Sequence, residues 1–157
     1  MNTRPLSLHL LLVIAFAIAM ANVEATVVVY IRQILGWIPV PADIGPDAIR
    51  QVPDDLIFRE RLRETATIVM LATFSLAAAR RWLQRVGTFL VAFAVWDIFY
   101  YVWLYVLIRW PPTLTTMDCL FLIPEPWLAP VWFPLTVSVA LFVAGIALLV
   151  VGGRPAG

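Results

Sequence analysis

Acidic side chains interrupt the apolar stretches of this chain, and they are the residues whose chemistry needs an explanation. Glu24, Glu64 and Asp97 each fall inside or at the edge of a hydrophobic run. A carboxyl group in a membrane is costly, so it usually faces the protein interior, where it binds a ligand, carries a proton or pairs with a base. We therefore expect these three side chains to point toward one another.

Residue spacing places these acids on common helix faces. One polar stripe follows the spacing i, i+4, i+7, and contains Glu60, Glu64, Thr67, Leu71 and Ser75. In the next apolar run, a second face combines Asp97, Tyr101 and Tyr105. Both faces should point into a helical bundle, because a charge that faces lipid costs a few kcal/mol or more.

The pattern predicts one outward-facing site to which several helices contribute. The candidate catalytic residues, which would transfer protons, are Asp97, Glu64 and Tyr101. The candidate ligand-binding residues are Glu24, Glu60, Arg63, Asp118 and Tyr100. Three carboxylates are also candidate metal ligands, namely Glu24, Glu64 and Asp97, and such all-oxygen ligands suit Mg²⁺, Ca²⁺ or Mn²⁺.

Several readings of this site stay open. It could bind a divalent cation, or a lipid-soluble ligand such as an isoprenoid or quinone beside Trp96 and Trp103. Carboxyl groups in a dry cavity can also move protons. Alternatively, the acids only pair with arginines such as Arg32 and Arg61 and lock the bundle. The sequence does not decide whether the protein is an enzyme.

Composition excludes several classes of function. Hydrophobic residues make up 62% of the 157, only 13% are charged, and the mean hydropathy is +0.91, so lipid must cover most of the surface. A net charge of +1 argues against nucleic acid as a partner. With one cysteine, Cys119, and one histidine, His9, a Cys-rich metal site or a bis-histidine haem is not expected.

The apolar runs predict an all-α polytopic membrane four-helix bundle that forms a single transmembrane domain over residues 1–157. The expected spans are residues 6–31, 58–79, 86–108 and 131–151. Residues 32–57, rich in Pro, Gly and Asp, form an extracytoplasmic loop. The proline-rich segment 109–130 is interfacial or re-entrant, and Thr115 to Asp118 could cap a short helix within it.

Details of three spans qualify this topology. The first run also fits a signal peptide cleaved after Ala21, an alternative to a first span. In the second, only about 15 residues separate Glu64 from Arg80, or roughly 22 Å of helix against a hydrocarbon core of ~30 Å. Glu64 must then lie in or at the edge of the membrane. In the fourth, Ala140 and Ala144 offer a small-residue packing face.

Arginine placement predicts the sidedness. Four spans put both termini and the turn at residues 80–85 on one side, which holds no acid and these bases: Arg4, Arg80, Arg81, Arg85 and Arg154. Short loops obey the positive-inside rule best, so we expect both termini in the cytoplasm. The expected partners are the lipid bilayer and either other membrane subunits or further copies of this chain.

The sequence resembles a family of small, uncharacterised bacterial four-span integral membrane proteins. The likeness rests on Trp-Asp-Ile-Phe-Tyr-Tyr at 96–101, Trp-Pro at 110–111, Phe-Leu-Ile-Pro-Glu-Pro-Trp at 121–127, and Glu-Arg-Leu-Arg-Glu-Thr-Ala-Thr at 60–67. It covers most of the chain and implies this fold and the bacterial cytoplasmic (inner) membrane, but no activity.

Two weaker likenesses concern proteins of known activity. Small membrane-type lycopene cyclases carry a Pro-x-Glu motif, which Pro124 and Glu125 resemble, although Pro126 replaces the second acid. Small multidrug transporters carry a Glu in the first of four helices, as Glu24 does, but their short loops differ from residues 32–57. The leading reading is therefore the ligand site, and its alternative is a non-catalytic structural subunit or scaffold of a larger membrane complex.

Overall fold

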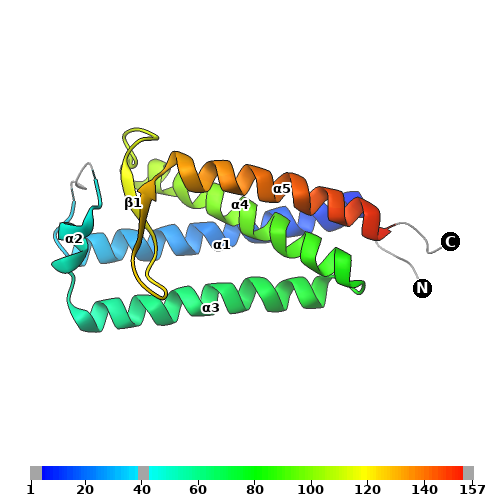
Figure 1. Ribbon diagram of the computed structural model, residues 1–157, viewed down its shortest axis with the longest axis horizontal. Helices are drawn as coiled ribbons and strands as arrows, with labels where there is room; N and C mark the ends of the chain where they lie inside the picture. Colours follow the sequence, from blue (N-terminus) through cyan, green and yellow to red (C-terminus); the bar gives the residue numbers. More distant parts are fainter. Residues whose placement is uncertain (1–4, 39–42, 154–157) are drawn as a thin grey trace.

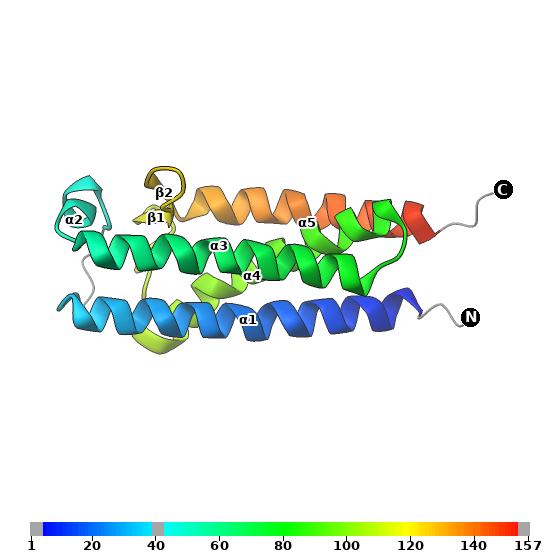
Figure 2. The ribbon, with the colours of Figure 1, turned by 90° about the horizontal axis from the view of Figure 1, so that it is seen from below.

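The computed structural model describes residues 5–38 and 43–153 and is 74% helical. The elements in chain order are α1 (Leu6–Ile34), α2 (Pro46–Arg50), α3 (Asp54–Ala78), α4 (Trp82–Ile108), β1 (Met117–Phe121), β2 (Trp127–Pro130) and α5 (Trp132–Gly153). The four long helices run along the long axis of the molecule (Figures 1 and 2). The start of α1, the α3–α4 turn and the end of α5 lie at one end, and α2 and the strands lie at the other.

Three of the helices, α1, α4 and α5, are long and apolar enough to cross a membrane among the residues that the structure describes. They indicate a membrane protein, and they coincide with the first, third and fourth predicted spans. The second predicted span lies in α3, a helix of 25 residues that begins at Asp54 rather than at residue 58. Charged side chains occupy the first half of α3. By length and composition alone, α3 is therefore not among the helices that could cross a membrane.

Helix α4 lies at the centre of the bundle, where it packs against α1, α3 and α5. Its closest approach is to α5, because two glycines face each other: a Cβ on Gly145 would lie 2.9 Å from the carbonyl oxygen of Gly87. Ala140 and Ala144, which were expected to offer a small-residue packing face, are exposed within this chain. The close small-residue contact with α4 is made by Gly145, one residue beyond Ala144.

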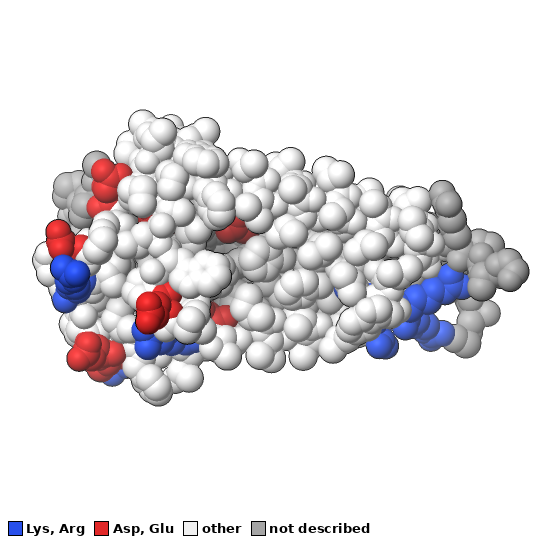
Figure 3. Space-filling view, in the orientation of Figure 1, with Lys and Arg blue, Asp and Glu red and all other residues white. Residues whose placement is uncertain are grey.

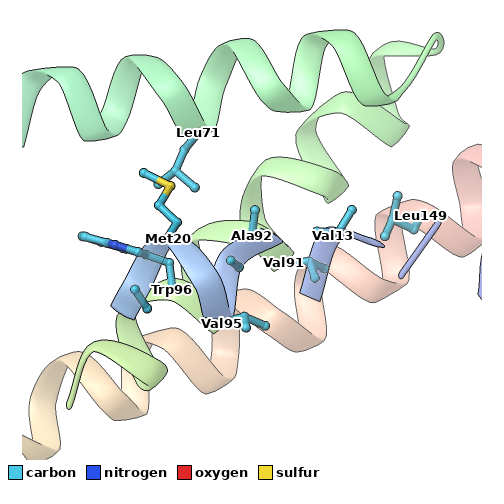
Figure 4. Close-up of a cluster of buried hydrophobic side chains, with 10 residues drawn as sticks. Val13, Met20, Leu71, Val91, Ala92, Val95, Trp96 and Leu149 are labelled. Carbon is cyan, nitrogen blue, oxygen red and sulfur yellow. The ribbon is translucent and has the colours of Figure 1, made fainter. Parts of the chain in front are cut away.

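Buried apolar side chains from all four long helices meet in one core (Figure 4). Val13 and Met20 of α1 meet Leu71 of α3 there, together with a row from α4 and Leu149 of α5. The rings of Phe16 and Phe74 stack beside it, with centroids 4.0 Å apart. The buried positions of α3 are Glu64, Thr67, Leu71 and Ser75, which confirms four members of the predicted stripe, whereas Glu60 is only partly buried.

The proline-rich segment 109–130 forms a small antiparallel sheet, so the strictly all-α prediction and the proposed short helix at residues 115–118 are wrong. Met117 pairs with Pro130 and Cys119 with Leu128, and the register shifts before Phe121. Prolines at both sides of β1 prevent a continuous helix, and pairing of the extended residues between them satisfies their backbone groups. The amide of Ile44 also donates to the carbonyl oxygen of Met117 at 2.9 Å, which ties the preceding loop to the sheet.

Candidate functional site

A cavity of about 130 Å³ lies at the end of the bundle that carries α2 and the strands. All eight predicted catalytic and ligand-binding residues line it: Glu24, Glu60, Arg63, Glu64, Asp97, Tyr100, Tyr101 and Asp118. Apolar side chains from α1, α2 and α3 contribute much of the remaining wall, including Val28, Ile31, Leu35, Ile49 and Leu56, and β1 and the adjoining loops add others. Figure 3 shows the acidic side chains gathered toward this end of the molecule, with some acidic atoms visible in hollows between neutral side chains.

Glu24 and Glu60 share one arginine, which joins α1 to α3 at the cavity wall. Arg63 donates from Nη1 to Glu24 and from Nε to Glu60, the second at 2.8 Å. The hydroxyl of Thr67 also donates to Glu24, at 3.1 Å from Oε2. Glu24 is only 7% exposed, so these partners replace the water that its carboxylate loses on burial.

Glu64 connects α3 to the sheet rather than to another charged side chain. Its two carboxylate oxygens accept from the backbone amide of Leu122, at 2.9 and 3.2 Å. Arg61 donates from Nε to the carbonyl oxygen of the same residue at 3.1 Å. The polar face of α3 therefore positions the chain just after β1 as a wall of the cavity.

Asp118 on β1 is 2% exposed and receives polar contacts from two helices. The hydroxyl of Tyr101 donates to it at 3.0 Å, and the guanidinium of Arg32 lies 3.7 Å away. That guanidinium also stacks over Trp110, with its Cζ 3.9 Å from the ring centroid. Burial raises the pKa of Asp118 above its ordinary value, although Arg32 and the Tyr101 hydroxyl act in the opposite direction.

Asp97 lies on the α4 side of the cavity and contacts α5. The hydroxyl of Ser138 donates to its Oδ2 at 2.8 Å. The rings of Tyr100 and Tyr101 meet edge to face, with centroids 5.1 Å apart. Asp97, Tyr101 and Tyr105 were predicted to share one inward-facing side of the helix. The prediction is wrong for Tyr105, which is 50% exposed.

The carboxyl groups line one cavity without forming one cluster: Glu24 and Glu60 share Arg63, whereas Glu64, Asp97 and Asp118 contact other groups. No three His, Cys, Asp or Glu side chains within residues 5–38 and 43–153 come together in a way that could hold a metal ion. The structure gives no support to a metal site at Glu24, Glu64 and Asp97, and we do not carry the divalent-cation reading further.

Two side chains outside the predicted catalytic and ligand-binding set are central to the site, although the sequence suggested that Arg32 could pair with an acid and that Trp96 could lie beside a ligand. Arg32 and Trp96 line the cavity and are 4% and 6% exposed. Arg32 Nη1 and Trp96 Nε1 have no hydrogen-bond partner among the described residues. Helical spacing could have found Arg32, which lies two turns beyond Glu24 on the same face as Val28. Trp96 precedes Asp97 in the sequence, and its position on the cavity wall agrees with the prediction that it lies near this acid.

Cys119 also lines the cavity, although its neighbours give it little reactivity. Burial raises the pKa of its thiol to about 12, and nearby Asp118 and Glu64 add to that effect. His9 lies far from this site, where its Nε2 makes a 2.9 Å hydrogen bond with the Thr88 hydroxyl. His9 therefore joins α1 to α4.

No protein family, curated protein or solved structure matches this chain. Its resemblance to small bacterial four-span proteins thus stays a prediction. Fold and cavity together define a mostly helical membrane protein with a polar, partly buried cavity at one end of its bundle.

Proposed function

We propose that this chain is a four-span integral membrane protein that binds a lipid-soluble organic ligand in the cavity described above. In this proposal α3 is the fourth span, and its charged first half lies at the membrane edge. The polar residues hold the head of the ligand, and Asp97, Glu64 and Tyr101 are the groups placed to exchange protons with it.

One observation carries the proposal: a single cavity combines an apolar wall with buried polar side chains from α1, α3, α4 and β1. Its volume of about 130 Å³ is far more than the roughly 10–15 Å³ that one water requires. Pockets that are mainly apolar, with a few polar groups converging on them, are typical of sites for organic ligands. The pairs Arg63–Glu24 and Arg32–Asp118 support a neutral or amphipathic guest, because they already neutralise part of the buried charge.

The charge distribution supports an orientation with the cavity outside. Arg80, Arg81 and Arg85 lie at the end opposite to the cavity, and Figure 3 shows basic but no acidic side chains there on the visible face. By the positive-inside rule this end is cytoplasmic, which places both termini inside and the cavity at the outer face of a bacterial cytoplasmic membrane.

Native mass spectrometry of the protein purified in mild detergent tests the ligand. We expect an organic molecule to remain bound to wild-type protein and to be lost from Val28→Phe, which fills the cavity wall. Val69→Phe is the matched control, because Val69 is 54% exposed on α3 and does not line the cavity. Equal retention of a bound molecule by the two variants would contradict the proposal.

The same measurement distinguishes the alternative of a structural subunit. A second protein that remains bound in fixed stoichiometry, with no small molecule in the cavity, would favour the scaffold reading. A bundle that carries a small molecule and no partner favours the ligand site.

A further inference from the structure

A shallow groove with no charged side chain in its lining lies beside the sheet and the start of α5 (Figure 1). Three of its aromatic side chains are well exposed: Trp127 at 56%, Trp132 at 48% and Phe133 at 46%. A contiguous apolar patch of this kind marks a surface that a partner covers. The groove is lined by Leu120, Trp127, Leu128, Ala129, Pro130, Trp132 and Phe133.

The length of α5 places this groove at the edge of the membrane. Its 22 residues extend over about 33 Å of helix, close to the ~30 Å thickness of a hydrocarbon core. The helix is also apolar enough to cross a membrane. Trp132 therefore lies at one boundary of the hydrocarbon when Gly153 lies at the other, and β2 ends only two residues before Trp132, at Pro130.

The hydrogen bonding of the sheet sets its depth more narrowly. Among the described residues β1 and β2 form a two-stranded sheet, so the far edge of β2 has no neighbouring strand. Backbone groups at such an edge do not lie in the hydrocarbon core, because water cannot reach them there. Tryptophan is enriched in the interfacial layer just outside that core, where its ring packs against acyl chains and its N–H stays in polar surroundings.

We propose that this groove is a contact site for membrane phospholipid, in the interfacial layer of the leaflet at the cavity end of the bundle. The upper part of an acyl chain packs against Trp127, Trp132 and Phe133. Lipid is favoured over a second copy of this chain because the groove continues into the exposed apolar surface of α5, which includes Val139 and Val143. The site is separate from the cavity and does not depend on the ligand proposed for it.

Spin labels on single cysteines test the proposal in the full chain, in a Cys119→Ser background and with one protein in each phospholipid nanodisc. Trp127→Cys reports on the groove. Val139→Cys is the lipid reference, because Val139 is 56% exposed on α5, and Asp47→Cys is the water reference, because the Asp47 side chain is 91% exposed on α2. Power-saturation electron paramagnetic resonance measures collisions of each label with oxygen, which concentrates in lipid, and with a water-soluble nickel chelate.

We expect the ratio of oxygen to nickel collisions for the Trp127→Cys label to lie above that of Asp47→Cys and below that of Val139→Cys. A ratio equal to that of Asp47→Cys means that water covers the groove, and overturns the proposal. Few collisions with either reagent mean that protein covers it, as a second copy would, and also overturn the proposal. Frequent nickel collisions at the Val139→Cys label would show that α5 is not in lipid, which removes the depth argument and the proposal with it.

Tryptophan fluorescence gives a second measurement that needs no label at the groove. Phospholipid brominated near the top of its acyl chains quenches the tryptophans that it contacts. Trp127→Phe should reduce the quenched part of the emission, whereas the control Trp110→Phe should not, because Trp110 is 2% exposed and lines neither the groove nor the cavity. Equal quenched emission in Trp127→Phe and the wild type would contradict the lipid contact.

Discussion

Arg32 of α1 and Asp118 of β1 form a buried ion pair, with Nη2 of the arginine 3.7 Å from Oδ1 of the aspartate and both side chains at most 5% exposed. The two residues are far apart in the sequence, so the contact fastens the strand to the first helix. A buried charge that loses its partner is strongly destabilising, because it has given up its hydration for that contact.

Asp118→Asn should therefore lower the free energy of unfolding by roughly 3–5 kcal/mol, although asparagine can still accept the hydrogen bond from Tyr101. Thermal unfolding in detergent measures the loss. The double variant Arg32→Met, Asp118→Asn removes both charges and should recover much of the stability. If the single and double variants are equally unstable, the ion pair is not the cause.

Glu64 holds the segment after β1 through the backbone amide of Leu122. Glu64→Ala leaves that buried amide without its acceptor, which should destabilise this attachment by about 1–3 kcal/mol. Hydrogen exchange at Leu122 should become faster, whereas Glu64→Gln, which keeps one acceptor oxygen, should change it much less. Glu125→Ala is the control at the exposed tip between the strands, and should leave exchange at Leu122 unaltered.

The close approach of α4 and α5 depends on two glycines. Gly145→Ala should lower the free energy of unfolding by about 1–3 kcal/mol, because the new Cβ would lie 2.8 Å from Cγ2 of Val91 and 2.9 Å from the carbonyl oxygen of Gly87. Gly153→Ala is the matched control on the same helix, since nothing lies within 4 Å of its added Cβ. Equal melting temperatures for the two variants would show that the helices separate at little cost.

The thiol of Cys119 should react slowly with maleimides in the folded protein. Its pKa of about 12 lies far above the ordinary thiol value, so at pH 8 the thiolate fraction is on the order of a thousandfold below that of a free cysteine. The rate should rise about tenfold for each pH unit between 8 and 10.

A cysteine at the exposed position Thr115, in a Cys119→Ser background, provides the reference rate for this measurement. It should react at the ordinary speed and approach its plateau near pH 9. Similar rates for the two cysteines at pH 8 would contradict the raised pKa of Cys119.

The inward orientation of the polar residues could be predicted from the sequence, because a polar side chain that faces lipid is costly. The spacing of Glu64, Thr67 and Ser75 along α3 already indicates one buried face, and the structure confirms it. The cost of exposing Glu24 or Asp97 to lipid similarly predicts that they face inward, and both line the cavity.

The contacts among these residues were not predictable, because they depend on non-local pairing. Nothing local in residues 109–130 shows that Met117 will pair with Pro130, so the position of Asp118 beside Arg32 had no sequence signal. The rotation of α5 about its own axis decides that Gly145, and not Ala144, contacts α4. The sequence of α5 is almost uniformly apolar, so it does not specify this rotation.

The cavity draws its walls from positions as distant as Glu24 and Leu122, with α3 and α4 in between. During synthesis it cannot exist until the strand after α4 has been made and has docked onto Glu64 and Arg32. A compound that binds there recognises only the finished chain and shifts the folding equilibrium toward it by mass action. Occupancy of this cavity would thus report that these distant segments have assembled.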